Sequence, residues 1–128
     1  MKKIIIVALF FLTSACATVG SLQPGSGGLT VEVRNKSYDE VWMASVSAMS
    51  NDDLSIVESD KSSGAIKSEA GVGLTTWGEV VGLFIRPTTP SAELYTVEVV
   101  SKKRMQTQIT GSDWEPIVIN NVKKELDI

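Results

Sequence analysis

Apolar and polar residues alternate along several segments of the chain, which is typical of strands with one buried face. In residues 29–35, valines alternate with threonine, glutamate and arginine, and this pattern predicts a first strand. Two shorter strands are predicted over 54–59 and 65–69. The polar loop 60–64 between them ends in glycine, which favours a hairpin.

Three more strands are predicted in the second half of the chain. Residues 80–86 form a near-continuous apolar strand, and the prolines of 87–90 end it. Residues 94–101 alternate again, which predicts another half-buried strand. The basic run 102–104 is predicted to form the next turn, and a last strand is predicted over 105–110.

Ser37 and Glu40 mark the start of a helix. A serine followed three residues later by a glutamate is a capping box, in which each side chain satisfies a free backbone amide. The helix is predicted to run to about Ser50. Its apolar stripe includes Tyr38 and Trp42, so we expect this face to pack against a sheet.

A second helix is predicted to close the chain. Ser112 or Asp113 would cap its start, and Pro116 fits the first turn, where a missing amide costs nothing. Its apolar residues recur every four positions: Trp114, Val118, Val122 and Leu126. We expect this stripe to be buried.

The order of a strand, a helix, several strands and a helix predicts a single α+β domain over residues 29–128. Both helices carry apolar stripes, and a sheet face is the surface that would cover them. We therefore expect one curved antiparallel sheet. A helix follows its first strand, and the C-terminal helix packs across the sheet.

The start of the chain has the pattern of an export signal. Two lysines give a positive start, residues 4–12 carry no charge, and the small residues Ser14 and Ala15 precede Cys16. The apolar run is too short for a transmembrane helix, which needs about 20 apolar residues. Residues 1–15 are therefore predicted to be a signal peptide that is removed.

The order small-small-Cys at this place resembles the lipobox of bacterial lipoproteins. The resemblance implies cleavage before Cys16, diacylglycerol on its sulfur and an acyl chain on its new amino terminus, an anchor that makes release from a membrane negligible. Thr13 departs from the leucine that is commonest at its position. Ala17 stands where an aspartate tends to retain such proteins in the inner membrane, which implies the periplasmic leaflet of a Gram-negative outer membrane. The alternative is an ordinary secretory peptide with a free cysteine nearby.

Composition narrows the chemistry of the mature chain. Removal of the signal leaves 113 residues with ten basic and fifteen acidic side chains, a net charge of −5 that makes nucleic acid a poor partner. The sequence has no histidine, which removes the commonest general base and metal ligand. With its sole cysteine acylated the domain has no disulfide and depends on its core, and neither a metal nor a cofactor is expected.

Residues 16–28 are predicted to hold the lipidated cysteine and a flexible tether. Glycine, serine and proline dominate this segment, which is typical of linkers. A coil of this length spans about 20 Å, which would let the domain float just off the lipid surface.

Two segments of the predicted domain share a pattern with known envelope proteins. Residues 37–42 read Ser-Tyr-Asp-Glu-Val-Trp, and 54–66 carry the hairpin with aspartate and glycine in its loop. This pattern resembles the domains of BamC-type lipoproteins of the outer-membrane barrel-assembly machine, which implies a helix-grip fold. Those proteins have two such domains and this chain has one, so the resemblance carries over no partner and no catalytic residue.

The sequence offers two candidates for contact with a partner. Trp77 lies among glycine, threonine and leucine, and such a tryptophan either marks a contact surface or folds back onto the end of the sheet. Lys102, Lys103 and Arg104 form the one basic run, which would contact an anionic headgroup or an acidic partner. Three charges make a weak field that salt screens, so a solvated turn is the favoured interpretation.

Two patterns that suggest catalysis are weak. The glycines of residues 71–82 lack the spacing of a phosphate-binding loop. An acidic cluster lies at the end of the first helix and in the hairpin: Asp52, Asp53, Glu58 and Asp60. Paired carboxylates catalyse glycoside hydrolysis and bind calcium, but charges at such places are usually solvated.

These observations favour a non-catalytic lipoprotein whose tethered domain binds another component of the cell envelope. One alternative is a carrier of a small apolar ligand, held between the sheet and the C-terminal helix. A third is a carboxylate-based enzyme that acts on peptidoglycan.

Overall fold

The computed structural model describes residues 19–51, 53–71, 78–89, 93–103 and 113–128. They form five strands, two α-helices and one short 3-10 helix. In chain order the elements are η1 (Val19–Ser21), β1 (Leu29–Arg34), α1 (Tyr38–Met49), β2 (Leu54–Asp60), β3 (Ala65–Ala70), β4 (Glu79–Pro87), β5 (Leu94–Lys103) and α2 (Trp114–Leu126).

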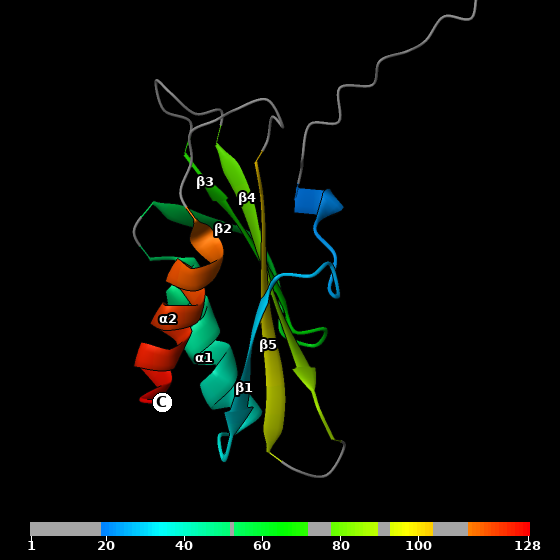
Figure 1. Ribbon diagram of the computed structural model, residues 1–128, viewed down its shortest axis with the longest axis vertical. Coiled ribbons are helices and arrows are strands. Elements are labelled where there is room, and N and C mark those ends of the chain that lie inside the picture. The colour runs from blue at the N-terminus through cyan, green and yellow to red at the C-terminus, as the bar shows by residue number, and fades with distance from the viewer. Residues whose placement is uncertain (1–18, 52, 72–77, 90–92, 104–112) are drawn as a thin grey trace, which may run out of the picture.

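The strands form one open antiparallel sheet in the order β1-β5-β4-β3-β2. Strands β2 to β5 follow one another as a meander, and β1 pairs with β5 at one edge. Helix α1 therefore carries the chain from one edge of the sheet to the other. Both helices lie together on one face of the sheet (Figure 1). The predicted α+β arrangement, with a helix after the first strand and a C-terminal helix on the sheet, is confirmed.

Local hydrogen bonds fix the start of α1. Ser37 Oγ accepts from the Glu40 amide (3.2 Å), and the Glu40 carboxylate accepts from the Ser37 amide (2.7 Å), so the predicted capping box is confirmed. The Ser37 amide, and to a smaller extent the Ser37 side chain, lowers the pKa of Glu40, because both stabilise the ionised carboxylate.

Of the two residues predicted to cap helix α2, Ser112 lies outside the described residues. Asp113 occupies the N-cap position, but within the described residues its side chain makes no capping hydrogen bond. Glu115 in the first turn instead accepts a hydrogen bond from the Ser101 amide of β5 (3.1 Å). This contact ties the start of α2 to the end of the strand before it.

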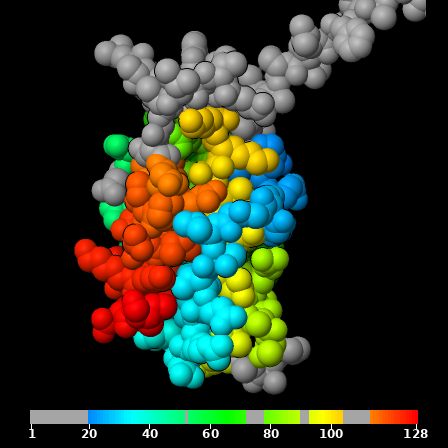
Figure 2. All heavy atoms as spheres, in the orientation of Figure 1, coloured from blue at the N-terminus to red at the C-terminus, as the bar shows by residue number. Residues whose placement is uncertain are grey.

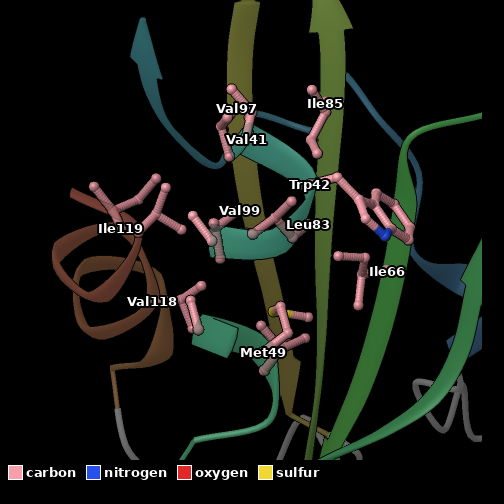
Figure 3. Close-up of a cluster of buried hydrophobic side chains, with 14 of the residues drawn as sticks. Val41, Trp42, Met49, Ile66, Leu83, Ile85, Val97, Val99, Val118 and Ile119 are labelled. Carbon is pink, nitrogen blue, oxygen red and sulfur yellow. The ribbon is translucent and has the colours of Figure 1, made fainter. Parts of the chain in front are cut away.

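The layer between the helices and the sheet is the main core (Figure 3). Helix α2 packs on α1 and on β1 and β5, while α1 packs on β2, β3 and β4. Trp42 and Trp114, both predicted to be core residues, are 9% and 6% exposed. Val118 of α2 and Met49 of α1 are fully buried and point into the same cluster as Leu83 of β4 (Figure 3).

Strand β5 is longer than the alternation predicted. Lys102 pairs with Val80 of β4, and Lys103 pairs with Glu79, so the predicted turn is wrong for these two lysines. Ladder partners on the neighbouring strand, rather than the charge of the side chains, decide where the strand ends. Arg104 and the strand predicted over 105–110 lie outside the described residues.

The segment before β1 also differs from the prediction. Residues 19–28, called the strap below, lie against the sheet face opposite the helices (Figure 1). Leu22 is buried, and a backbone amide of the strap bonds to a strand side chain. The flexible tether predicted for 16–28 is therefore wrong over the described part. The segment has the composition of a linker, and composition does not predict that Leu22 packs against an apolar patch on the folded sheet.

Candidate functional site

The contact residues predicted from sequence divide into two groups. Cys16, Trp77 and Arg104 lie outside the described residues, so their predicted roles stay predictions. Lys102 and Lys103 are the last two residues of β5 and belong to opposite faces of the sheet, because side chains alternate along a strand. Lys103 is exposed, whereas Lys102 is half-buried beside the strap.

The sheet face away from the helices, called the open face below, combines apolar and charged residues. Across β4 and β5 it places Val80 beside Lys102, Gly82 beside Val100, Phe84 beside Glu98 and Arg86 beside Thr96. The central part of this face is buried, although neither helix reaches it. Among the described segments, it is the strap that covers this part.

Leu22 anchors the strap. Its side chain is only 1% exposed and packs in a small cluster with Val80, Phe84 and Val100. The open face has a dent at Gly82, where an added β-carbon would lie 3.3 Å from Leu22 Cβ and 3.0 Å from the Phe84 ring. A glycine in the middle of a strand often marks such a close approach, and here it makes room for the leucine.

A buried carboxylate holds the next part of the strap. Glu98 of β5 is 3% exposed, and its Oε1 accepts a hydrogen bond from the Gly25 amide (2.6 Å). Arg86 of β4 places its guanidinium 3.7 Å from the same oxygen. A buried carboxylate is costly unless it is paired and hydrogen-bonded, and these two partners compensate it.

Two further contacts complete the path of the strap. Lys102 Nζ donates a hydrogen bond to the carbonyl of Ser21 (3.1 Å), the last residue of η1. At the other end, a β-carbon at Gly28 would collide with the carbonyl of Val99, so the strap passes closely over β5 before it continues into β1. Figure 2 shows the strap, in blue, lying against the yellow residues of β5. Contacts at Ser21, Leu22 and Gly25 therefore hold the strap on the sheet.

The acidic cluster predicted from sequence has structural partners. Asp53, Glu58 and Asp60 are exposed, and Asp52 lies outside the described residues. Glu58 lies 3.6 Å from Lys67 of β3. Asp60 accepts hydrogen bonds from the hydroxyl (2.6 Å) and the amide (3.0 Å) of Ser62. The serine side chains of this turn lower the pKa of Asp60 because they bind its ionised form.

The two buried carboxylates of the sheet do not form a catalytic pair. Glu98 belongs to the open face, whereas Glu79 alternates with Val80 and belongs to the helix side. The β4 partner of Glu98 is Phe84, so the two positions also lie roughly 16 Å apart along the strands. That separation exceeds the distance that glycoside hydrolysis needs between its two carboxylates.

The β2–β3 hairpin is tied to the start of α1. Tyr38 Oη donates to the Lys61 carbonyl (2.5 Å), and Lys61 Nζ lies 2.7 Å from the Asp39 carboxylate. The Tyr38 ring also packs on that of Tyr95, with centroids 5.6 Å apart. Partial burial raises the pKa of Tyr38 because it disfavours the ionised phenolate.

Metal binding and membrane spanning find no support in the described residues. There, no group of three or more acidic side chains is gathered closely enough to hold a metal ion. None of the helices in the same ranges has the length and apolar character needed to cross a membrane.

Sequence reasoning missed Leu22 and Glu98, although one signal pointed to Leu22. The run 80–85 is apolar at nearly every position, and strands of that kind are usually buried on both faces. One face of this strand packs against the helices, so a second segment of the chain has to cover the other face. Leu22 is the one large apolar residue between 20 and 28, which makes it the candidate.

Comparison with known proteins does not assign the chain to a family. No protein-family model matches the chain, and no curated protein is significantly similar to it.

Proposed function

We propose that the chain is a bacterial lipoprotein whose domain is a non-catalytic binding module of the cell envelope. The observation that carries this proposal is the charged start, the short apolar run and the Ser14-Ala15-Cys16 sequence. The anchor places the protein in the periplasmic leaflet of a Gram-negative outer membrane, because Ala17 follows the cysteine. The membrane is then its first partner, and a second envelope component is bound by the domain.

The fold supports a binding module over the two alternatives. Buried side chains from both helices and the sheet occupy the layer beneath α2, where a carrier would hold its ligand. Val118 and Val122, on the inner side of α2, are fully buried against this layer. The described carboxylates of the acidic cluster are exposed, and the two buried ones lie on opposite faces. The carrier and the enzyme therefore have less structural support than the binding module.

Lipidation is tested with the full-length chain expressed in a Gram-negative host. We expect intact-mass spectrometry to find the acylated mature form beginning at Cys16, and fractionation to place it in membranes. Cys16→Ser should carry no lipid and leave the membrane fraction. Thr13→Leu, which supplies the commoner lipobox residue, is the matched control and should be processed like the wild type. An unmodified thiol in the wild type, or Cys16→Ser in the same membrane pellet, would contradict the proposal.

The sorting part of the proposal has its own test. Ala17→Asp should move the acylated protein from the outer to the inner membrane in a density gradient. If the wild type bands with the inner membrane, the assignment to the outer membrane is wrong. If Ala17→Asp bands with the outer membrane like the wild type, residue 17 does not decide the sorting, and the lipid anchor stands in both cases.

The predicted contact residues are tested by crosslinking in isolated envelopes. We expect Trp77→Ala to lower the yield of the crosslinked partner. Replacement of both Lys103 and Arg104 by alanine in the Trp77→Ala protein should lower the yield further. Met43→Ala, at an exposed apolar position on α1, serves as the control and should leave the yield unchanged. Equal yields from all variants would show that the partner binds elsewhere.

A further inference from the structure

We propose that the docked strap orients the lipidated domain, so that the end of the sheet formed by Ala70, Glu79 and Lys103 faces the phospholipid headgroups. This inference rests on the lipid anchor proposed above. It names the surface that meets the bilayer, and it differs from the freely floating domain that the composition of residues 16–28 predicts.

One end of the sheet, called the strap end below, is defined by the register. Ala70 at the end of β3 pairs with Glu79 at the start of β4, which pairs with Lys103 at the end of β5. This is the upper end in Figure 1. Pro87 of β4 and Tyr95 of β5 pair at the opposite end. The two ends are roughly 26 Å apart along β4.

The strap begins at the strap end. The Ser21 carbonyl accepts from Lys102, one residue before the last position of β5. Leu22 packs beside Val80, the second residue of β4. The first described residues of the chain are therefore fixed near this end (Figure 1).

The length of chain left between the lipid and the domain is then short. Cys16 precedes Val19 by three residues, a span of about 11 Å even when fully extended. A free tether from Cys16 to Leu29 would extend to about 45 Å. With the strap docked, the chain between the lipid and the domain therefore spans less than half the distance between the two ends of the sheet. A domain held so closely by one end keeps that end at the lipid surface.

Charged side chains of both signs lie at the strap end, where Lys103 pairs with Glu79. Lys103 is exposed there, and Lys102 lies beside the strap. A lysine close to an anionic leaflet is attracted to it, and Lys103 is exposed whereas Glu79 is buried, so the exposed charge at this end favours the orientation. The opposite end, with the β2–β3 hairpin and the start of α1, projects away from the membrane.

The test measures the distance of each end from the lipid. Because Cys16 is acylated, an introduced cysteine is the one reactive thiol of the mature chain. Gly71→Cys labels the strap end at an exposed site where an added β-carbon meets nothing, and Thr89→Cys labels the exposed opposite end. Each acylated protein is labelled with a fluorophore and placed in phosphatidylethanolamine–phosphatidylglycerol vesicles that carry a nitroxide lipid.

We expect the fluorophore at Gly71→Cys to be quenched several-fold more than that at Thr89→Cys. Leu22→Asp should abolish the difference, because a carboxylate in the apolar dent releases the strap and lengthens the tether. Gln23→Asp makes the same charge change at an exposed neighbour and should keep the difference. An insertion of about twelve Gly-Ser residues between Thr18 and Val19 lengthens the tether without touching the strap and should also abolish it.

Two kinds of failure are distinguishable. Equal quenching at both ends of the acylated, vesicle-bound protein overturns the orientation and leaves the lipid anchor intact. The same holds if the inserted linker changes nothing. A protein that shows a free Cys16 thiol and does not float with the vesicles overturns both the anchor and the orientation.

Discussion

Replacement of Leu22 by alanine should release the strap without unfolding the domain. Among the strap side chains whose burial the structure describes, those of residues 20–28, Leu22 is the fully buried one, and it packs in the dent at Gly82 on the outside of the sheet. The helices and their core lie on the other face and do not depend on it. We therefore expect a local opening of residues 20–28 rather than a global one.

The magnitude follows from the contacts that are lost. Truncation of a fully buried leucine to alanine in a core costs about 2–5 kcal/mol, of which the cavity left behind is a part. The cluster around Leu22 is small and lies on the outside of the sheet, where the strap can move to fill the space, so the cost lies near the lower limit, at about 2 kcal/mol. A change of this size raises the open population of the strap about 30-fold.

Native-state hydrogen exchange measures this population directly. The Gly25 amide is protected by its bond to Glu98, so its exchange rate should rise about 30-fold in Leu22→Ala. Leu29→Ala makes the same chemical change at a leucine that is 44% exposed, and it should leave the Gly25 amide nearly unchanged. If Gly25 exchanges equally in the wild type and in Leu22→Ala, Leu22 does not hold the strap.

Two further predictions follow from individual side chains. Within the described residues, the Ser45 hydroxyl of α1 is buried without a hydrogen-bond partner. Ser45→Ala should therefore raise the free energy of unfolding, measured in urea, by about 1 kcal/mol. A free energy of unfolding below that of the wild type would mean that the hydroxyl has a partner. The pKa of Asp60 lies below its ordinary value of 3.8, because the Ser62 side chain and then that of Ser63 bind the carboxylate. Its stabilising effect is therefore complete above about pH 4 and is lost as the pH falls through the lowered pKa. An NMR titration of the carboxyl carbon should show the low pKa, and Ser62→Ala should return it toward 3.8, whereas an unchanged value would contradict the assignment.

Much of the secondary structure could be predicted from the sequence because its signals are local. The capping box joins residues three positions apart, and its hydrogen bonds form as predicted. Alternation identified β1 and β5, and the apolar stripes of both helices correctly placed Trp42 and Trp114 in the core. A sheet face was needed to cover two apolar stripes, which was enough to predict the α+β arrangement.

The features that the sequence did not reveal depend on contacts between distant residues. Gly25 and its acceptor Glu98 are 73 positions apart, and Lys102 and Ser21 are 81 positions apart. The composition of the strap is that of a linker, and its one leucine becomes an anchor because Gly82 leaves space for it on the folded sheet. In the same way, Lys102 belongs to a strand because β4 offers it a ladder partner.

The sequence by itself determined the periodicity of the elements, the layer that the helices cover and the candidate anchor at Cys16. The tertiary structure decided that the strap is docked rather than free, and that a buried glutamate and a glycine dent hold it. Local propensity acts within a few residues along the chain. Burial on the open face of the sheet becomes favourable only once the strands that build that face have come together.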